Sequence, residues 1–439
     1  MASEWEEATL GAEADMLTGF PFRSERYTDA DDSIRLVRGD NIVQGALRWD
    51  GVKRWPRSES AEHELYQLRE GDVVLAMDRP WIEAGLKYAA ISKHDLPCLL
   101  VQRTARLRGG PNLDTQFLRY LIGSPKFTQH VHAITTGTAV PHISGRQIKE
   151  FTFLRPPLAE QRAIAHILGT LDDKIELNRR MSETLEAMAR ALFKSWFVDF
   201  DPVRAKSEGR DPGLPKSLTD LFPDAFADSP IGEIPRGWHV QMLGDIVEHL
   251  RDSENPLDSS DQLFRHFSIP AYDVDRWPAS EFGESIKSLK FRVPPCAVLL
   301  SKLNPEIERV WLVDVQHGDR AVCSTEFLVL APRPPYGRAY IYCAMRSPSF
   351  RCDLESLVTG TSKSHQRAQP DAILGLAIVE PPTTLITAFE RTAGPLLDRT
   401  LECGEESRAL AALRDALLPK LISGELRIED PTRFLRCVD

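Results

Sequence analysis

The sequence predicts an α/β (α+β) fold in which two similar mixed α/β domains are separated by an antiparallel pair of long coiled-coil helices, with an internal pseudo-twofold repeat. Three observations predict it. Short motifs recur in the same order in the two halves of the chain, which indicates an internal repeat. Each copy begins with short apolar runs and ends in a long stretch of helix formers, and a segment rich in proline and glycine joins the copies.

Composition restricts the class of protein. With 439 residues, 42% hydrophobic and 27% charged, the chain is typical of a soluble protein of several domains. It has an acidic N-terminus and no apolar run long enough to span a bilayer, so we expect a cytoplasmic protein without a signal peptide. Its seven scattered cysteines favour reduced thiols. The net charge of −10 argues against a simple polycationic nucleic-acid binder, although only the charge that faces the phosphates sets DNA affinity.

The matched motifs set the period of the repeat. They are residues 5–11 with 238–244, 71–75 with 295–299, 124–127 with 347–350, 136–138 with 359–361, and 156–157 with 381–382. At the offset fixed by the two Thr-Gly-Thr motifs, His142 falls on His365. Within the copies, punctuated apolar runs predict strands at residues 72–77, 99–107, 297–300 and 326–330, and helices at 114–122 and 340–345.

The repeat divides the chain into six parts. They are a first domain at residues 1–155, a central long helix at 156–200, a linker at 201–237, a second domain at 238–380, a distal long helix at 381–425 and a C-terminal tail at 426–439. The linker is rich in Asp-Pro, Pro-Gly and similar pairs, which are typical of a connector.

Both long helices follow a Pro-Pro pair and carry apolar residues at alternating spacings of four and three, which is the pattern of a coiled-coil seam. The predicted seam residues are Ile164, Leu168, Leu171, Ile175, Leu185, Leu192, Leu396, Leu410, Leu417 and Leu421, with Leu413 on the same distal stripe and the polar Asn178 and Ser182 filling the central seam. Because one striped helix cannot bury its stripe alone, we expect the two helices to pair and hold the two domains apart.

No motif for catalysis is complete. Arg333 precedes Pro334-Pro335-Tyr336 where an adenine methyltransferase needs Asn or Asp, and no glycine-rich cofactor loop or phosphate-binding loop accompanies it. The histidines and cysteines lack metal-site spacing. We therefore predict no catalytic residue, no metal and no cofactor on this chain.

Polar side chains after each Thr-Gly-Thr motif are the best candidates for DNA contact, because groove reading needs such groups on loops. They are His142, Ser144, Arg146 and Gln147 in the first copy, and Lys363, His365, Gln366 and Arg367 in the second. Secondary candidates are Lys53, Arg54, Gln102 and Arg103, with Lys302 and Asn304 directly after an expected strand.

Several segments resemble the specificity subunits of type I restriction–modification systems. Residues 156–162 (PPLAEQR), 171–176 (LDDKIE), 197–203 (FVDFDPV) and 221–238 resemble the central repeat of that family, and residues 417–426 (LLPKLISGEL) resemble its distal repeat. The distal helix departs from the pattern, because Thr383-Thr384-Leu385 stands where the central helix has Glu160-Gln161-Arg162.

The resemblance implies a non-catalytic subunit. Each domain would be a target recognition domain that reads one half of a split site in double-stranded DNA, and the helix pair would set the unread gap. Two modification subunits would methylate adenine with S-adenosylmethionine, and restriction subunits would use ATP and Mg²⁺ for translocation and cleavage.

Other functions remain open at this point. The chain could be a DNA-reading adaptor of another phage-defence methylation complex, which would differ only in its partners. A coiled-coil scaffold without a DNA role predicts no salt-dependent DNA binding, whereas the affinity of a DNA reader falls steeply with salt. A self-contained nuclease or methyltransferase is disfavoured by the incomplete motifs.

Overall fold

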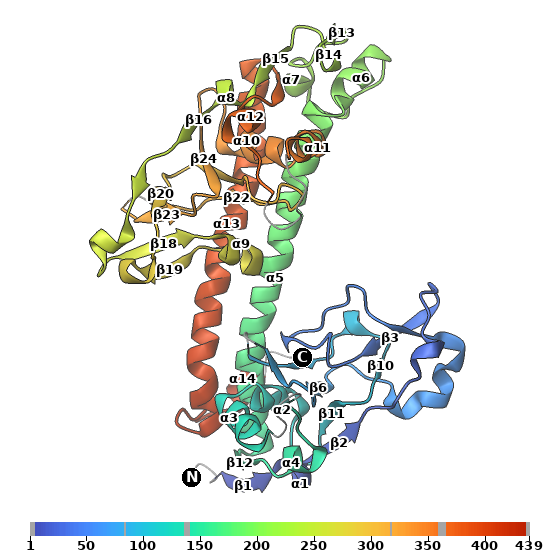
Figure 1. Ribbon diagram of the computed structural model, residues 1–439. Helices are drawn as coiled ribbons and strands as arrows, with labels where there is room; N and C mark the ends of the chain where they lie inside the picture. The colour runs from blue at the N-terminus through green and yellow to red at the C-terminus, as the bar shows by residue number, and fades with distance from the viewer. Residues whose placement is uncertain (1–4, 83–84, 136–140, 317, 359–365, 436–439) are drawn as a thin grey trace. The chain divides into compact units, whose positions relative to one another are not determined.

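The computed structural model describes residues 5–82, 85–135, 141–316, 318–358 and 366–435. The chain forms two compact units. Unit 1 comprises Met1–Glu176 and Ser407–Asp439, and unit 2 comprises Leu177–Glu406. The long helices α5 (Leu158–Phe197) and α13 (Thr383–Ser423) both cross this division, so each unit contains one globule and part of each helix (Figure 1).

The globule of unit 1 is built on a five-stranded and a three-stranded sheet. The larger sheet has the order β2 (Ala14–Thr18), β11 (Thr104–Gly109), β6 (Val73–Ala76), β9 (Tyr88–Ala90) and β4 (Gln44–Gly45). The smaller sheet has the order β10 (Cys98–Leu100), β3 (Ser33–Val37) and β5 (Arg54–Pro56). The remaining pairs are β1 (Glu6–Thr9) with β12 (Thr152–Arg155) and β7 (Trp81–Ile82) with β8 (Gly85–Leu86).

Four short helices share a core with the larger sheet of unit 1: α1 (Leu10–Glu13), α2 (Thr115–Ile122), α3 (Pro125–Ile134) and α4 (Gly145–Lys149). Unit 1 also contains 3-10 turns at Ser24–Arg26, Arg57–Tyr66 and Lys93–Asp95 and the helix α14 (Thr432–Leu435). The starts of α2 and α3 follow from the sequence, because Asp114 and Ser124 cap the amide groups of these two helices. The expected strand at residues 99–107 is divided between β10 and β11, because Arg103 turns the chain with φ 65°.

Unit 2 repeats this plan with sheets of four and five strands. The first sheet has the order β16 (Val247–Leu250), β24 (Phe327–Pro332), β21 (Val298–Ser301) and β22 (Val310–Leu312). The second has the order β17 (Ser253–Glu254), β20 (Lys290–Arg292), β23 (Ala321–Cys323), β18 (Leu263–Phe267) and β19 (Ala279–Phe282). The strand β15 (His239–Met242) pairs with β25 (Ala377–Glu380). The helices are α8 (Leu243–Ile246), α9 (Ile269–Asp275), α10 (Arg338–Met345), α11 (Pro348–Ser356) and α12 (Pro370–Leu374), with 3-10 turns at Pro256–Ser259 and Gly283–Ser285.

The repeat predicted from the sequence is a repeat of structure, down to strand register. In unit 1 Thr104 of β11 lies opposite Ala76 of β6, and in unit 2 Phe327 of β24 lies opposite Ser301 of β21. The strands β2 and β16 have the same antiparallel pairing, β2 with β11 and β16 with β24. The prediction of two similar mixed α/β domains with paired long helices is confirmed.

In unit 1, the first part of α5 packs against the last part of α13. Ile164 and Leu168 are fully buried, as is Leu421. Asp172 accepts a hydrogen bond from Arg414 at 2.8 Å, while Glu160, earlier in α5, accepts one from Arg427, beyond the end of α13. The contacts run in opposite chain directions, so the pair is antiparallel here. Leu171, Ile175, Leu410 and Leu417 are half-buried in this part of the pair, whereas Leu413 is 48% exposed and does not belong to the seam.

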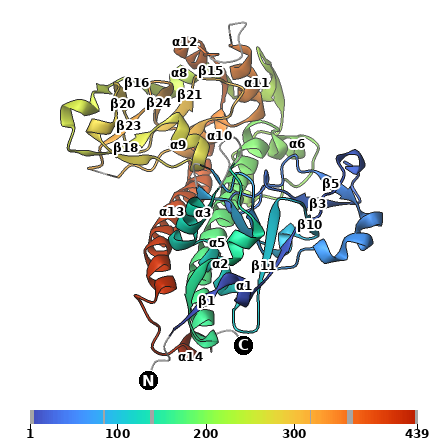
Figure 2. The same ribbon diagram turned by 60° about the horizontal axis from the view of Figure 1, so that its bottom comes forward.

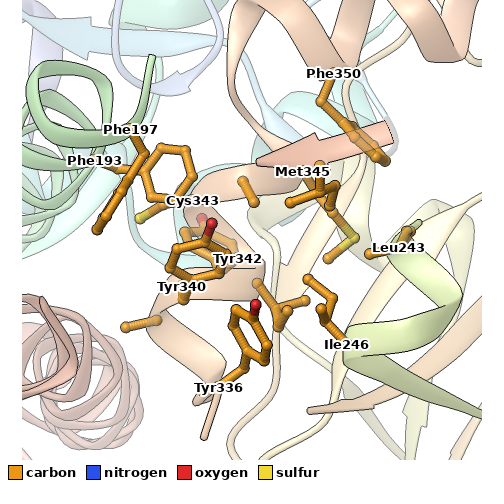
Figure 3. Close-up of a cluster of buried hydrophobic side chains, with 14 of the residues drawn as sticks. Phe193, Phe197, Leu243, Ile246, Tyr336, Tyr340, Tyr342, Cys343, Met345 and Phe350 are labelled. Atoms are coloured by element: carbon orange, nitrogen blue, oxygen red, sulfur yellow. The ribbon is translucent and has the colours of Figure 1, made fainter. Parts of the chain in front are cut away.

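In unit 2, the helix pair shares a core with the globule. Figure 3 shows Phe193 and Phe197 of α5 pointing toward Tyr340 of α10, and each phenylalanine ring lies 5.2 Å from the tyrosine ring. The polar seam is also present, since Asn178 donates to Glu406 at 3.0 Å. Figures 1 and 2 both show the two helices side by side. Leu185, Leu192 and Leu396 are half-buried in this unit.

The segment 201–237 is folded as part of unit 2. It contains α6 (Asp201–Ser207), α7 (Lys216–Thr219) and a hairpin of β13 (Phe226–Ser229) and β14 (Gly232–Pro235). Its aromatic side chains join the core, because Phe222 contacts Trp196 of α5 with ring centroids 5.4 Å apart. The turn residues that predict a connector therefore punctuate a packed segment.

Candidate nucleic-acid interface

Three segments that are distant in the sequence meet at the end of strand β6 in unit 1. The Met77 amide donates to the Arg103 carbonyl at 2.9 Å, and the Ile143 amide donates to the Met77 carbonyl at 2.9 Å. The Arg79 amide donates to the carbonyl of Pro141 at 2.7 Å. We call residues 77–79, 103 and 141–143 the first junction. It brings together two of the predicted DNA-contact residues, Arg103 and His142.

One carboxylate organises the side chains of the first junction. Asp78 pairs with Arg103 through one oxygen and with His142 Nδ1 through the other, the latter at 2.5 Å. Burial alone would raise the pKa of Asp78, but the hydrogen bonds from Arg103 and His142 outweigh it and hold the pKa below its usual value. The Arg103 side chain remains 67% exposed. A cation is thus held in place at the surface by a largely buried acid.

Unit 2 has the same backbone arrangement at the end of β21. The Lys302 amide donates to the Glu326 carbonyl at 3.0 Å, and the Ala368 amide donates to the Lys302 carbonyl at 3.0 Å. The Asn304 amide donates to the Gln366 carbonyl at 2.8 Å. We call residues 302–304, 326 and 366–368 the second junction. The predicted candidates Lys302, Asn304, Gln366 and Arg367 all lie in it.

The two junctions share an unusual backbone conformation. Arg79 and Asn304 occupy equivalent positions and have φ angles of 45° and 48°, which lie in the left-handed region that few residues other than glycine adopt. Backbone of this kind is concentrated at functional sites. Its retention in both copies, with different side chains, indicates that the turn itself is needed.

The side chains of the second junction differ from those of the first. The carboxylate is now Glu326, which stands where the first junction has Arg103. The Arg367 guanidinium donates from Nε to both Glu326 oxygens at 3.0 and 3.2 Å, and from Nη2 to Oε1 at 2.9 Å. These hydrogen bonds raise the pKa of Arg367. Each junction therefore keeps one acid that holds a cation, but the acid comes from a different position.

The junctions correct the alignment of the two copies. The bridge between Asp78 and His142 in unit 1 corresponds to the bridge between Leu303 and Arg367 in unit 2. The structural counterpart of His142 is therefore Arg367 and not His365, because the second copy has two more residues between Ser347 and Arg367 than the first has between Ser124 and His142. Lys363 and His365 lie outside the described residues.

Ser144 and Gln147 form a helix cap. Ser144 caps α4, and its Oγ and amide both donate to Gln147 Oε1 at 2.8 Å. Gln147 Nε2 donates to the carbonyl of Ile134 at 2.8 Å. The structure thus gives the polar groups of both side chains partners within unit 1. They position the chain that follows His142.

A groove lies beside the first junction. It is lined by Thr9, Met16, Thr18, Gly145, Arg146, Lys149 and Glu150. Arg146 is 89% exposed and pairs with Glu150 one helical turn away. Lys149 was not predicted as a contact residue. Two cations on one short helix, next to a strand edge, form a surface suited to phosphate groups.

The remaining candidates of unit 1 lie away from the first junction or next to it. Lys53 and Arg54 lie at β5 in the three-stranded sheet, where Arg54 donates to Ser33 Oγ at 3.3 Å, and they are not part of the junction. Gln102 is exposed in the turn next to Arg103.

Sequence reasoning missed Asp78, Arg79 and Glu326. Asp78 and Arg79 could have been found, since they follow the repeated strand as Lys302 and Asn304 do in the second copy.

The structure also bears on the motif around Tyr336. Tyr336 is buried in the core of unit 2, and Gln241 donates to its hydroxyl at 2.5 Å. The Pro-Pro-Tyr sequence is thus a packed turn before α10. Among the described residues, no three histidine, cysteine or acidic side chains are grouped as metal ligands would be. In the same part of the chain, no helix combines the length and the apolar character needed to cross a membrane.

Two copies of one globule, each with a polar junction at the same strand edge, define a duplicated recognition protein. Residues 22–187 match the family described as the type I restriction modification DNA specificity domain. The chain is 25% identical over 406 residues to the type I restriction enzyme MjaIX specificity subunit of Methanocaldococcus jannaschii, covering 90% of this chain and 84% of that one. It is 26% identical over 368 residues to the HindI specificity subunit of Haemophilus influenzae, covering 71% and 77%.

A solved structure shares the fold. The S subunit of a type I restriction–modification system from M. genitalium superposes with a TM-score of 0.59 and 15% identity over 96% of each chain. The chain is similar to the specificity subunits of type I restriction–modification systems over most of its length, and these matches support a function in DNA sequence specificity. It is a non-catalytic subunit without a cofactor of its own.

Proposed function

We propose that this chain recognises a split, asymmetric DNA sequence, with the first junction reading one half and the second junction the other. The observation that carries the proposal is the repetition of one backbone arrangement with different side chains. Backbone hydrogen bonds and left-handed turns are shared by the two junctions, whereas Asp78, Arg103 and His142 are replaced by Leu303, Glu326 and Arg367. Two domains that recognise different half-sites need the same backbone arrangement with different polar side chains.

The side chains are of the right chemical kinds. Arginine can contact guanine through two hydrogen bonds, asparagine and glutamine can contact adenine, and a carboxylate can accept from cytosine. Arg103, Arg367, Asn304 and Gln366 supply such groups at the junctions. The cations Arg146 and Lys149 on α4 would contact phosphates and set the register. This local charge offsets the acidity of the whole chain.

We infer that the chain acts in a complex with other restriction–modification subunits. Two modification subunits would bind S-adenosylmethionine and methylate adenine within the recognised sequence. Restriction subunits would bind ATP and Mg²⁺ and use ATP hydrolysis for translocation and cleavage. Lys363 and His365 remain candidates for DNA contact beside Arg367.

The proposal is tested by co-expressing the full chain with the methyltransferase encoded beside it and sequencing host DNA for methylated adenine. The expected result is a split methylated motif that appears only with this chain. Replacing residues 1–155 by those of another specificity subunit should change one half of the motif, and replacing residues 238–380 should change the other.

Two results would contradict the proposal. If each replacement altered both halves of the motif, the assignment of one half to each domain would be wrong. If a stable complex formed without new methylation and without salt-dependent DNA binding, the chain would be a scaffold, because DNA affinity that rests on phosphate contacts must fall with salt.

A further inference from the structure

We propose that Glu326 is a positioning residue that presents Arg367 to a guanine in the half-site read by unit 2. The inference rests on the proposed function and adds the chemical identity of one base and the residue that selects it. It starts from the edge of the guanidinium that Glu326 occupies. The three hydrogen bonds from Arg367 to Glu326 use Nε and Nη2 as donors, at 2.9 to 3.2 Å.

A guanidinium has two edges that can make paired hydrogen bonds. Glu326 holds the edge formed by Nε and Nη2, so the end formed by Nη1 and Nη2 points away from the carboxylate. That end carries the parallel N–H groups that match the O6 and N7 acceptors of guanine in the major groove. Glu326 thus fixes the plane of the arginine and leaves the correct edge for the base. The geometry would fix the arginine before DNA arrives, which lowers the entropy that binding must overcome.

Stability does not account for this ion pair. The side chains of Arg367 and Glu326 are 49% and 24% exposed, and exposed pairs of this kind contribute little to folding. The neighbouring groups are also fixed by the backbone alone, through the hydrogen bonds of Lys302, Asn304 and Ala368. The pair is therefore available for a role outside folding.

The first junction also pairs an acid with an arginine, although there Asp78 contacts Nη1 of Arg103. There the acid is Asp78 on the strand end, whereas in unit 2 the acid is Glu326 on the turn before β24. The residues at the acid's position differ between the copies, yet each junction retains a carboxylate paired with a surface arginine. An arrangement kept while its sequence positions change indicates that the pairing is needed at the reading edge.

The test uses the full chain co-expressed with its neighbouring methyltransferase and compares methylation of duplexes that differ at one base pair. The motif half belonging to unit 2 is identified first by replacing residues 238–380. We expect it to contain a guanine whose substitution strongly reduces methylation. Glu326→Gln should lower the discrimination for that guanine by about tenfold, within the range that one bidentate arginine contact provides, and leave the other half of the motif unchanged.

Arg367→Lys distinguishes a base contact from a phosphate contact. Lysine keeps the charge but cannot make the paired contact, so it should relax the same guanine. Asp319→Asn is the matched control, because Asp319 pairs with Arg265 at 3.0 Å elsewhere in unit 2. It should leave the motif unaltered.

Four results would overturn the inference. If Glu326→Gln reduced methylation at every site equally and lowered the unfolding temperature, the residue would be structural. If Arg367→Lys retained full guanine discrimination, Arg367 would be a phosphate contact. A split motif that no variant relaxes would refute the inference and leave the proposed function standing, whereas the absence of any split motif would refute both.

Discussion

Glu160 joins the two ends of the described chain in unit 1, and its removal is expected to loosen both. It accepts hydrogen bonds from Trp5 Nε1 at 3.0 Å, from Arg427 Nε and Nη2 at 2.8 and 3.0 Å, and from the Ile428 amide at 3.3 Å. The Arg427 guanidinium also lies 5.0 Å from the Trp5 ring. The Glu160 side chain is 5% exposed, so water cannot replace it at these donors without rearrangement.

The contacts set the size of the effect. A hydrogen bond to a charged group is worth about 1.5–3 kcal/mol, but Arg427 is 34% exposed and can recover part of its hydration. We therefore expect Glu160→Ala to lower the stability of unit 1 by roughly 2–4 kcal/mol, which corresponds to a fall of roughly 5–12 °C in unfolding temperature for a unit of this size.

The pH dependence of this effect has a definite sign. Burial would raise the pKa of Glu160, but the hydrogen bonds from Arg427, Trp5 and Ile428 outweigh it and hold the pKa below its usual value of 4.5. A carboxylate with a lowered folded-state pKa stabilises above its unfolded pKa and loses this contribution as the pH falls through the folded value. The difference between the native chain and Glu160→Ala should therefore be full at neutral pH and shrink below about pH 4.5.

Thermal unfolding measures the loss of stability in Glu160→Ala, and hydrogen exchange of residues 5–9 and 424–435 measures the loosening of the two chain ends. Glu183→Ala is the control, because Glu183 lies on the same helix in an exposed pair with Arg179 and should cost at most about 0.5 kcal/mol. If Glu160→Ala were no more destabilising than Glu183→Ala, or if its effect persisted unchanged at pH 3, the reasoning would be refuted.

Two further predictions concern the helix pair and the groove. Leu168→Ala should destabilise unit 1 by about 2–5 kcal/mol because its side chain is fully buried, whereas Leu413→Ala should change the unfolding temperature little; equal effects would mean that the seam is misplaced. Lys149→Ala should weaken binding of the methyltransferase complex to all DNA sequences alike and reduce the slope of log affinity against log salt by about 1; an altered methylation motif with an unchanged slope would instead make Lys149 a base contact.

Much of the fold follows from local sequence. The repeat is visible in motifs such as Ser124-Pro125 and Ser347-Pro348. In both copies the serine caps a helix and the proline is the first residue of that helix, so the same helix start carries the same two residues. The long helices follow from the spacing of apolar residues, since a stripe repeated over many turns can be buried only against another helix. Asn178 within that stripe indicated the polar seam contact later found with Glu406.

The two junctions could be predicted only in part. The sequence identified Arg103, His142 and Arg367 as polar residues on loops. It did not show that Arg103 and His142 lie together at the end of β6, or that Arg367 lies at the end of β21. Asp78 and Glu326 were missed because an acidic residue is not expected near DNA unless the cation with which it pairs is known. For the same reason, Ser144 and Gln147 were predicted as DNA-contact residues on a loop, whereas their polar groups form the cap of α4.

The sequence by itself determined the duplication, the pairing of two long helices and the family, because all three rest on periodic or local patterns within the chain. Only the tertiary structure decided which residues form each junction, that Arg367 and not His365 is the counterpart of His142, and that Leu413 lies outside the seam. These depend on contacts between segments far apart in the chain, such as residues 77–79 with 103 and 141–143, and a spacing of residues along one segment does not encode what another segment places beside it.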